Sequence, residues 1–82
     1  MDMTKVYEVS EFNDALTKDV LKEVYTILED RGYNPINQII GYIMSGDPGY
    51  ITSYKDARNK MLSLERSKII EVLLKELMKW DI

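Results

Sequence analysis

Residues 32–46 read GYNPINQIIGYIMSG, and this stretch holds the start, the body and the end of one predicted helix. Asn34 is a preferred helix N-cap, and Pro35 suits the first helical position because its missing N–H would be unpaired there anyway. Gly46 is expected to end the helix, since glycine readily adopts the left-handed conformation at that point. The pattern predicts a helix over residues 35–45.

Apolar side chains recur along this predicted helix at helical spacing. Ile36, Ile39, Ile40 and Ile43 occupy positions i, i+3, i+4 and i+7, and therefore share one face. We expect these four isoleucines to belong to the core. Gly41 lies in the middle of the helix, where it costs about 1 kcal/mol relative to alanine, so we expect a close neighbour there, most simply a second helix.

The segments on either side also show helical patterns. A second helix is predicted over residues 16–31, ended by Gly32, and its apolar stripe consists of Leu16, Val20, Val24, Ile27 and Leu28. After Gly46, Asp47 and Pro48 are expected to open a tight turn. A last helical region is predicted over residues 53–79, with a break at residues 64–67 because its two apolar stripes are out of phase there.

The first residues of the chain differ from the rest in pattern and charge. Residues 1–14 lack helical periodicity, and we expect a flexible, irregular, acidic N-terminal arm followed by a helical domain over residues 15–82. Residues 1–16 hold four acidic side chains and one lysine, a net charge of −3, whereas the remaining residues hold ten of each sign. The whole net charge of −3 therefore resides in the arm.

Length and pattern together define the expected fold class. The sequence predicts an all-α protein, a compact bundle of about four helices. A chain of 82 residues is short for an independent hydrophobic core, and without cysteine no disulfide adds stability. A second copy of the chain is then the simplest source of additional buried surface, and we expect a homodimer.

Composition excludes most catalytic classes. The sequence has no histidine and no cysteine, so neither a Ser-His-Asp triad nor a Cys-His pair is possible, and the commonest metal ligands are missing. No glycine-rich phosphate or dinucleotide motif is present. We expect a protein that is not an enzyme and has no catalytic residues, metal site or cofactor.

The strongest basic feature is a mixed-charge segment. Residues 50–66 combine two tyrosines with Lys55, Arg58, Lys60 and Arg66, but Asp56 and Glu65 dilute its charge. An accessory role with nucleic-acid or translation machinery, using the Tyr50–Arg66 face, is the alternative hypothesis. The first residues lead into no apolar stretch, and no run approaches the roughly 18 apolar residues of a membrane span, so we expect a cytoplasmic protein without membrane insertion.

The block GYNPINQIIGYIMSGDPGYI (residues 32–51) resembles the central signature of the IreB family. The similarity continues through YKDARN (54–59), LER (64–66) and IIE (69–71), and extends over roughly residues 20–78. The resemblance implies a helical, dimeric, cytoplasmic regulatory phosphoprotein of Gram-positive bacteria. It also implies phosphorylation by a transmembrane Ser/Thr kinase with PASTA repeats, and a role in cell-envelope stress and cephalosporin resistance.

The resemblance also points to a modification site. Phosphoacceptors of the family are threonines near the N-terminus, and an ungapped count from the signature places Thr4 at one of them, with Thr17 and Ser10 as fallback sites. A phosphate would add about −1.5 to −2 charge to the acidic arm. We expect the phosphorylated arm to dock near Arg58 or Arg66.

Two sets of residues complete the expected sites. Polar and aromatic residues that we expect to form a dimer or partner surface are Tyr33, Asn37, Gln38, Tyr42, Ser45, Asp47, Arg58, Asn59, Arg66 and Trp80. Residues with an expected role as helix caps or stops are Asn34, Pro35, Gly46 and Pro48.

Overall fold

The computed structural model describes the backbone of residues 3–80 and the side chains of residues 12–79. Over this range helices are the only regular secondary structure. The elements, in chain order, are α1 (Met3–Asp30), α2 (Pro35–Ser45), the 3-10 turns η1 (Pro48–Tyr50) and η2 (Tyr54–Asp56), α3 (Ala57–Leu62) and α4 (Arg66–Trp80). The predicted all-α class is confirmed.

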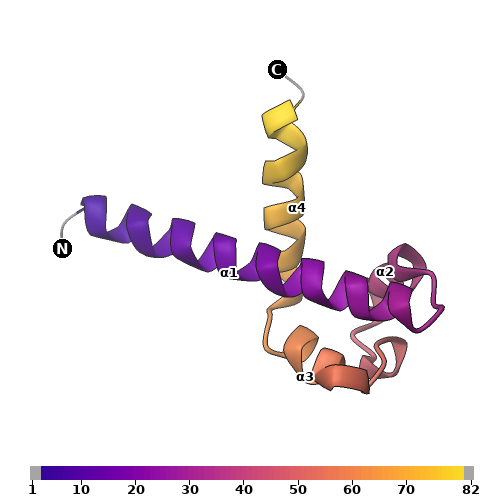
Figure 1. Cartoon of the computed structure of the whole chain (residues 1–82). Coiled ribbons are helices and arrows are strands. Elements are labelled where there is room, and N and C mark those ends of the chain that lie inside the picture. Colours follow the sequence, from indigo (N-terminus) through magenta and orange to yellow (C-terminus); the bar gives the residue numbers. More distant parts are fainter. Residues whose placement is uncertain (1–2, 81–82) are drawn as a thin grey trace.

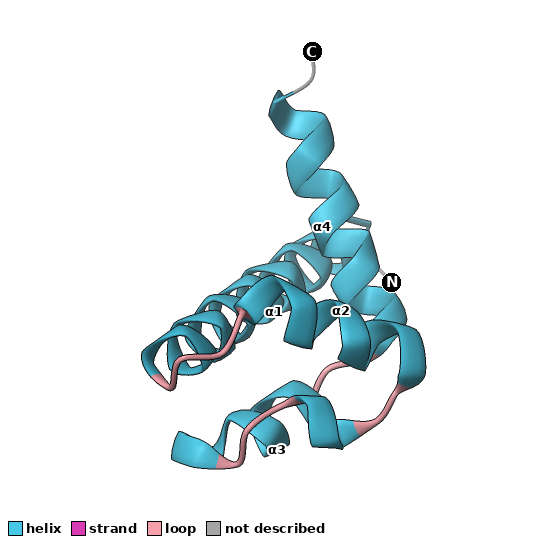
Figure 2. Cartoon of the chain, turned by 90° about the vertical axis from the view of Figure 1, so that its right-hand side faces the viewer, coloured by secondary structure: helices cyan, strands magenta, loops and turns pink. Residues whose placement is uncertain are grey.

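Helix α1 is the element on which the others assemble. Helices α2, α3 and α4 all contact α1. Figure 1 shows α2 and α3 beside the C-terminal half of α1, whereas α4 crosses α1 near its middle and points away from them. Seen from the side in Figure 2, α3 lies below α1 and α2. The N-terminal half of α1 and the C-terminal half of α4 therefore both extend beyond the common core.

The predicted ends of α2 are confirmed. The Asn34 side chain accepts a hydrogen bond from the Asn37 N–H at 3.1 Å, and Pro35 occupies the first turn. Gly46 ends the helix with φ of 75°, and its N–H donates to the Tyr42 carbonyl at 2.7 Å. Gly32 has φ of 82° after α1. These local signals fix where α2 begins and ends.

Replacing Asn34 with alanine tests the cap directly. Loss of the side-chain acceptor leaves the Asn37 N–H without its partner, and we expect the free energy of unfolding to fall by about 1 kcal/mol. Urea denaturation followed by circular dichroism measures this change. Asn34→Asp is the matched control, because a carboxylate also caps the helix, and equal losses in both variants would contradict the assigned role.

The irregular structure expected over residues 1–14 is not found over residues 3–14, because a helix runs without interruption from Met3 to Asp30. The first 31 residues contain no glycine and no proline, so no residue in this segment stops a helix that is nucleated further along. Residues 1 and 2 lie outside the described range. The acidic segment is thus part of α1, and Asp14 lies well inside the helix.

The predicted break near residues 64–67 is confirmed. Helix α3 ends at Leu62 and α4 begins at Arg66, with Ser63, Leu64 and Glu65 forming the link. Leu64 packs against the core and ties this link to the body. The change of phase between the two apolar stripes therefore marks a real change of helix direction.

The core lies between the C-terminal half of α1 and the elements packed on it. Its buried residues are Val24, Ile27, Leu28, Tyr42, Ile51, Ala57, Met61 and Ile69. The expectation that all four isoleucines of α2 are core is wrong for two of them, because Ile36 and Ile40 are 56% and 53% exposed. Ile39 and Ile43 pack against the core, and Tyr42, only 4% exposed, completes the buried face.

Gly41 has a close neighbour, as its position predicted, but the neighbour is not a helix. The Tyr50 ring of η1 lies on α2 so closely that a Cβ at Gly41 would be 2.4 Å from Tyr50 Cε1. The Gln38 side-chain amide also donates to the Tyr50 carbonyl at 2.9 Å. One turn of α2 therefore holds the η1 turn in place through a ring contact and a hydrogen bond.

Candidate partner-binding surfaces

Several residues expected at a partner surface instead hold the irregular segment 46–56. Ser45 Oγ donates to the Gly41 carbonyl at 2.7 Å and accepts from the Asp47 N–H at 3.0 Å. The Asp47 carboxylate accepts from the Gly49 N–H at 2.8 Å and caps η1, whose first residue is Pro48. Ser45, Asp47 and Pro48 thus have a structural role in this turn.

The two arginines bind backbone carbonyl groups of the same chain. Arg58 Nε donates to the Pro48 and Ile51 carbonyls at 3.1 and 2.9 Å, which ties α3 to the segment before it. Arg66 donates to the Ile43 carbonyl at 3.0 Å, and its guanidinium lies over Gly46. Arg58 thus joins α3 to the η1 segment, and Arg66 joins α4 to the last turn of α2.

Other side chains of the Tyr50–Arg66 face also have contacts within the chain. Lys60 pairs with Glu23 of α1, and the guanidinium of Arg31 stacks on the Tyr54 ring at 4.2 Å from its centroid. Asn59 donates to the Asp56 carboxylate at 2.8 Å. These contacts weaken the case for a nucleic-acid surface, because such a surface needs free cations directed at phosphates.

The other expected surface residues divide into three groups. Tyr42 is wrong as a surface residue, since its ring is buried and follows Ile39 by one helical turn on the core-facing side of α2. Tyr33 and Asn37 are exposed. The side chains of Thr4 and Trp80 lie outside the described residues, although the Thr4 backbone belongs to the first turn of α1.

An exposed apolar stripe runs along α4. Its members are between 43% and 60% exposed and recur at i, i+3, i+4, i+7 and i+8. We call this set the α4 stripe, and it consists of Ile70, Leu73, Leu74, Leu77 and Met78. Only Ile69 and Val72 of the described α4 side chains are buried, so the helix keeps more apolar surface outside than inside.

The α4 stripe continues onto the rest of the body. Leu73 shares an apolar hollow of about 430 Å³ with Leu21, Tyr25 and Ile39, which joins α4 to α1 and α2. Beyond this hollow, α2 exposes a row of large apolar side chains, Ile36, Ile40 and Met44. Large exposed apolar patches of this kind mark protein interaction sites. Sequence analysis missed this surface because it assigned these isoleucines to the core.

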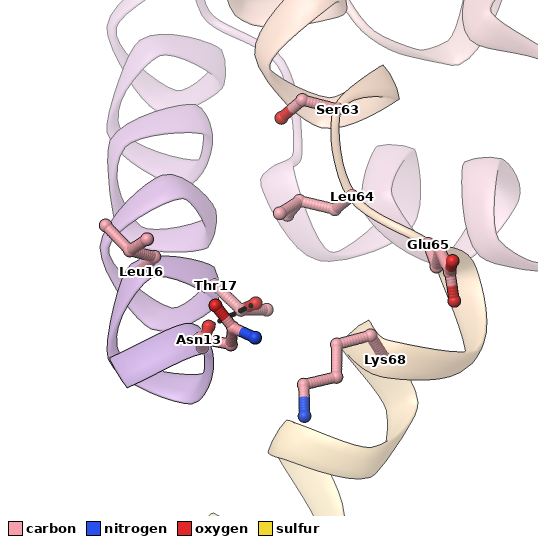
Figure 3. A pocket seen from close by; sticks show the side chains of 7 residues that line it. All are labelled: Asn13, Leu16, Thr17, Ser63, Leu64, Glu65 and Lys68. Atoms are coloured by element: carbon pink, nitrogen blue, oxygen red, sulfur yellow. Dashed lines mark hydrogen bonds between the residues drawn. The ribbon is translucent and has the colours of Figure 1, made fainter. Parts of the chain in front are cut away.

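A second, more polar cleft of about 390 Å³ lies between α1 and the link to α4. Figure 3 shows Thr17 of α1 and Leu64 of the link on opposite sides of it. The Thr17 hydroxyl, in a residue only 3% exposed, donates to the Asn13 carbonyl at 2.9 Å. Ser63 Oγ likewise donates to the Lys60 carbonyl at 2.6 Å. Both hydroxyl groups therefore have partners within the chain.

A network of ion pairs joins α1 to α4. Asp14 contacts Lys68 and Lys75, both of which also pair with Glu71. Contact with Lys68, and then with Lys75, lowers the pKa of the Asp14 carboxyl below its ordinary value. Further along the crossing, Lys18 pairs with Glu76 and lowers the pKa of that carboxyl.

These features define a small all-helical protein whose polar signature residues maintain its own fold and whose exposed surface is rich in apolar side chains. The model of the family described as IreB regulatory phosphoprotein matches residues 2–79. The chain belongs to this family, and it is a small regulatory protein. The family assignment made from the residue 32–51 block is thereby confirmed.

Within residues 3–80, helix length and hydropathy give no candidate for a membrane-crossing helix. Among the side chains that the structure describes, no three Asp or Glu residues gather in a group suited to a metal ion.

Proposed function

We propose that this protein is a cytoplasmic, homodimeric regulator that acts through protein–protein contacts and performs no catalysis itself. A transmembrane Ser/Thr kinase with PASTA repeats phosphorylates it in a Gram-positive host. The regulated process is the cell-envelope stress response, including resistance to cephalosporins. Membership of a regulatory phosphoprotein family supports the general role, and the exposed α4 stripe is the observation that supports action through protein contacts.

A second copy of the chain is the occupant that we propose for the α4 stripe. A domain of this size buries only about 60% of its unfolded surface, so it gains much from covering five further apolar side chains. Two-fold association lets the same stripe meet its own copy, and no surface of different chemistry is required. The hollow beside Leu73 extends the apolar area available to such an interface.

Thr4 is the proposed phosphoacceptor. It lies in the first turn of α1, near the end of the chain, where a phosphate interacts favourably with the helix dipole. Thr17, one of the fallback sites, is buried and its hydroxyl is bonded to Asn13, so access by a kinase requires local unfolding. The expected docking on Arg58 or Arg66 loses support, because both guanidinium groups already bind carbonyl oxygens.

Phosphorylation in vitro tests this assignment. The catalytic domain of the host's PASTA-type kinase is expected to phosphorylate the wild-type chain, and Thr4→Ala is expected to remove about nine-tenths of the incorporated phosphate if one acceptor dominates. Intact-mass spectrometry with peptide mapping gives the readout. Thr26→Ala, which removes an exposed threonine of the same helix, is the control and should incorporate as much as wild type.

The outcomes separate cleanly. Undiminished phosphorylation of Thr4→Ala would rule out Thr4 as the main acceptor. The same mass measurement on protein isolated from its host, with and without cell-wall stress, then tests whether the modification follows that stress.

A further inference from the structure

Helix α4 is attached to the rest of the chain by few buried apolar side chains. Its described residues bury only Ile69 and Val72. Its other attachments near the start are Leu64 of the link, which packs against the core, and Arg66, which donates to the Ile43 carbonyl. Figure 1 shows most of α4 extending beyond the point where it crosses α1. Two buried side chains alone are a weak anchor for a helix of 15 residues.

Charged side chains occupy the side of α4 next to its buried face. Lys68, Glu71 and Lys75 recur at i, i+3 and i+7; the two lysines contact Asp14 of α1, and Glu71 pairs with both lysines. One turn after Asp14 on α1, Lys18 contacts Glu76 of α4, which also pairs with Lys79 at 3.3 Å. The exposed α4 stripe borders this charged row, since Leu74 and Met78 line a shallow hollow together with Glu71 and Lys75. The charged row therefore supplies most of the polar contact between the two helices.

Asp14 is the centre of this arrangement. Its side chain is 15% exposed, the lowest exposure of any group in these ion pairs. Its Oδ2 accepts from Lys75 at 2.9 Å, and its Oδ1, which is buried and has no hydrogen bond of regular geometry, lies 2.5 Å from Lys68 Nζ. Loss of Asp14 would leave two lysines of α4 without their partner on α1.

We infer that α4 is an adjustable element clamped to α1 by the Asp14–Lys68–Lys75 ion pairs, and that Asp14 is the positioning residue that sets its direction. Because the α4 stripe is part of the same helix, this direction also sets where the stripe points. The inference concerns the packing of one chain and stands whether or not a second copy binds.

We call the Asp14–Lys68–Lys75 ion pairs the clamp. The charges around it predict how it responds to pH. The groups that face Asp14 are Lys18 on α1 and Lys68, Glu71 and Lys75 on α4, with Glu76 and Lys79 further along. Folding lowers the pKa values of the Asp14, Glu71 and Glu76 carboxyl groups. Their contribution to the stability of the fold is therefore present above the unfolded pKa and is lost as the pH falls through the folded pKa.

Folding raises the pKa values of Lys18, Lys68 and Lys75. Their contribution to the stability of the fold is therefore present below the ordinary lysine pKa and is lost as the pH rises through the folded pKa. The clamp is thus strongest between about pH 5 and pH 10.

Hydrogen exchange of the full chain at pH 7 tests the inference. In Asp14→Asn, amides of residues 66–80 are expected to exchange about three to five times faster relative to those of residues 35–45 than in wild type. Asp19→Asn is the matched control, because Asp19 is exposed on the same helix and forms no ion pair with any described residue. Proteins are compared at a concentration where sedimentation gives them the same mass.

Salt and a second variant complete the test. In 0.5 M NaCl, where the Debye length is about 4 Å, the difference between Asp14→Asn and wild type should shrink by at least half. Lys75→Gln should also accelerate exchange in residues 66–80, and it remains informative if Asp14→Asn does not fold. Combining the two changes should add less than the sum of their separate effects. An unchanged exchange ratio in Asp14→Asn, or strict additivity in the double variant, would overturn the inference.

Discussion

Replacing Gly41 with valine is expected to destabilise the folded chain by about 2 kcal/mol, because a Cβ at this position meets the Tyr50 ring. That Cβ would lie 2.4 Å from Tyr50 Cε1 and 2.5 Å from Cδ1, so the ring must leave α2. The η1 turn then loses its ring contact, and the Gln38 hydrogen bond to the Tyr50 carbonyl is strained. In a domain of this size the midpoint of thermal unfolding should fall by about 10 °C.

A double-mutant cycle separates the clash from helix propensity. The cycle uses Gly41→Ala in both backgrounds. With Tyr50→Ala the ring is absent, and Gly41→Ala is then expected to be neutral or to stabilise the protein by up to about 1 kcal/mol. Urea denaturation of the four proteins gives the coupling free energy. Equal effects of a Gly41 substitution with and without the Tyr50 ring would show that the ring contact does not explain this glycine.

Replacing Leu77 with glutamate is expected to weaken homodimerisation by about a hundredfold, provided the α4 stripe forms the interface. Leu77 is the most exposed residue of the stripe, at 60%, so a charge there is tolerated in the monomer. In the dimer the carboxylate would be removed from water among apolar side chains, without a cation to compensate. Sedimentation velocity over a range of concentrations measures the dissociation constant.

The matched control is Leu62→Glu. Leu62 is 48% exposed on α3, away from the stripe, and the same change there should leave the dissociation constant within about twofold of wild type. Circular dichroism establishes that both variants are folded. Equal affinities for Leu77→Glu and wild type would remove the α4 stripe from the interface, even if the chain is a dimer.

Local signals were the ones that sequence analysis interpreted correctly. Asn34, Pro35 and Gly46 act on backbone groups within one turn of themselves, so their roles follow from the sequence alone. The break before α4 is equally local, since it appears as a change of phase in the apolar pattern. The absence of any glycine or proline before residue 32 was the missed signal for the full length of α1.

Contacts between distant segments were not predictable in the same way. Ile36 and Ile40 belong to an amphipathic pattern, but the pattern does not say whether its apolar face meets the same chain or another one. The contact of the Tyr50 ring with Gly41 and the ion pair of Asp14 with Lys75 both depend on how the helices pack on one another.

The roles of several polar residues were likewise not predictable from the sequence. Ser45, Arg58 and Arg66 looked suited to a partner because no local role was evident for them. Their roles became clear only in the structure, where Ser45 and Arg58 bind backbone groups of residues 46–56 and Arg66 binds the Ile43 carbonyl of α2. Of residues 46–56 only Ile51 is buried, so these hydrogen bonds mainly fix the path of a largely exposed segment.

Isotope-filtered NMR on an equal mixture of labelled and unlabelled chains tests the central claim, that a second copy covers the α4 stripe. The account predicts intermolecular nuclear Overhauser effects from the methyl groups of Leu73, Leu74 and Leu77, and none from those of Leu62. A sample that is dimeric by sedimentation but shows intermolecular effects only outside α4, or one that remains a 9.6 kDa monomer at millimolar concentration, would contradict it.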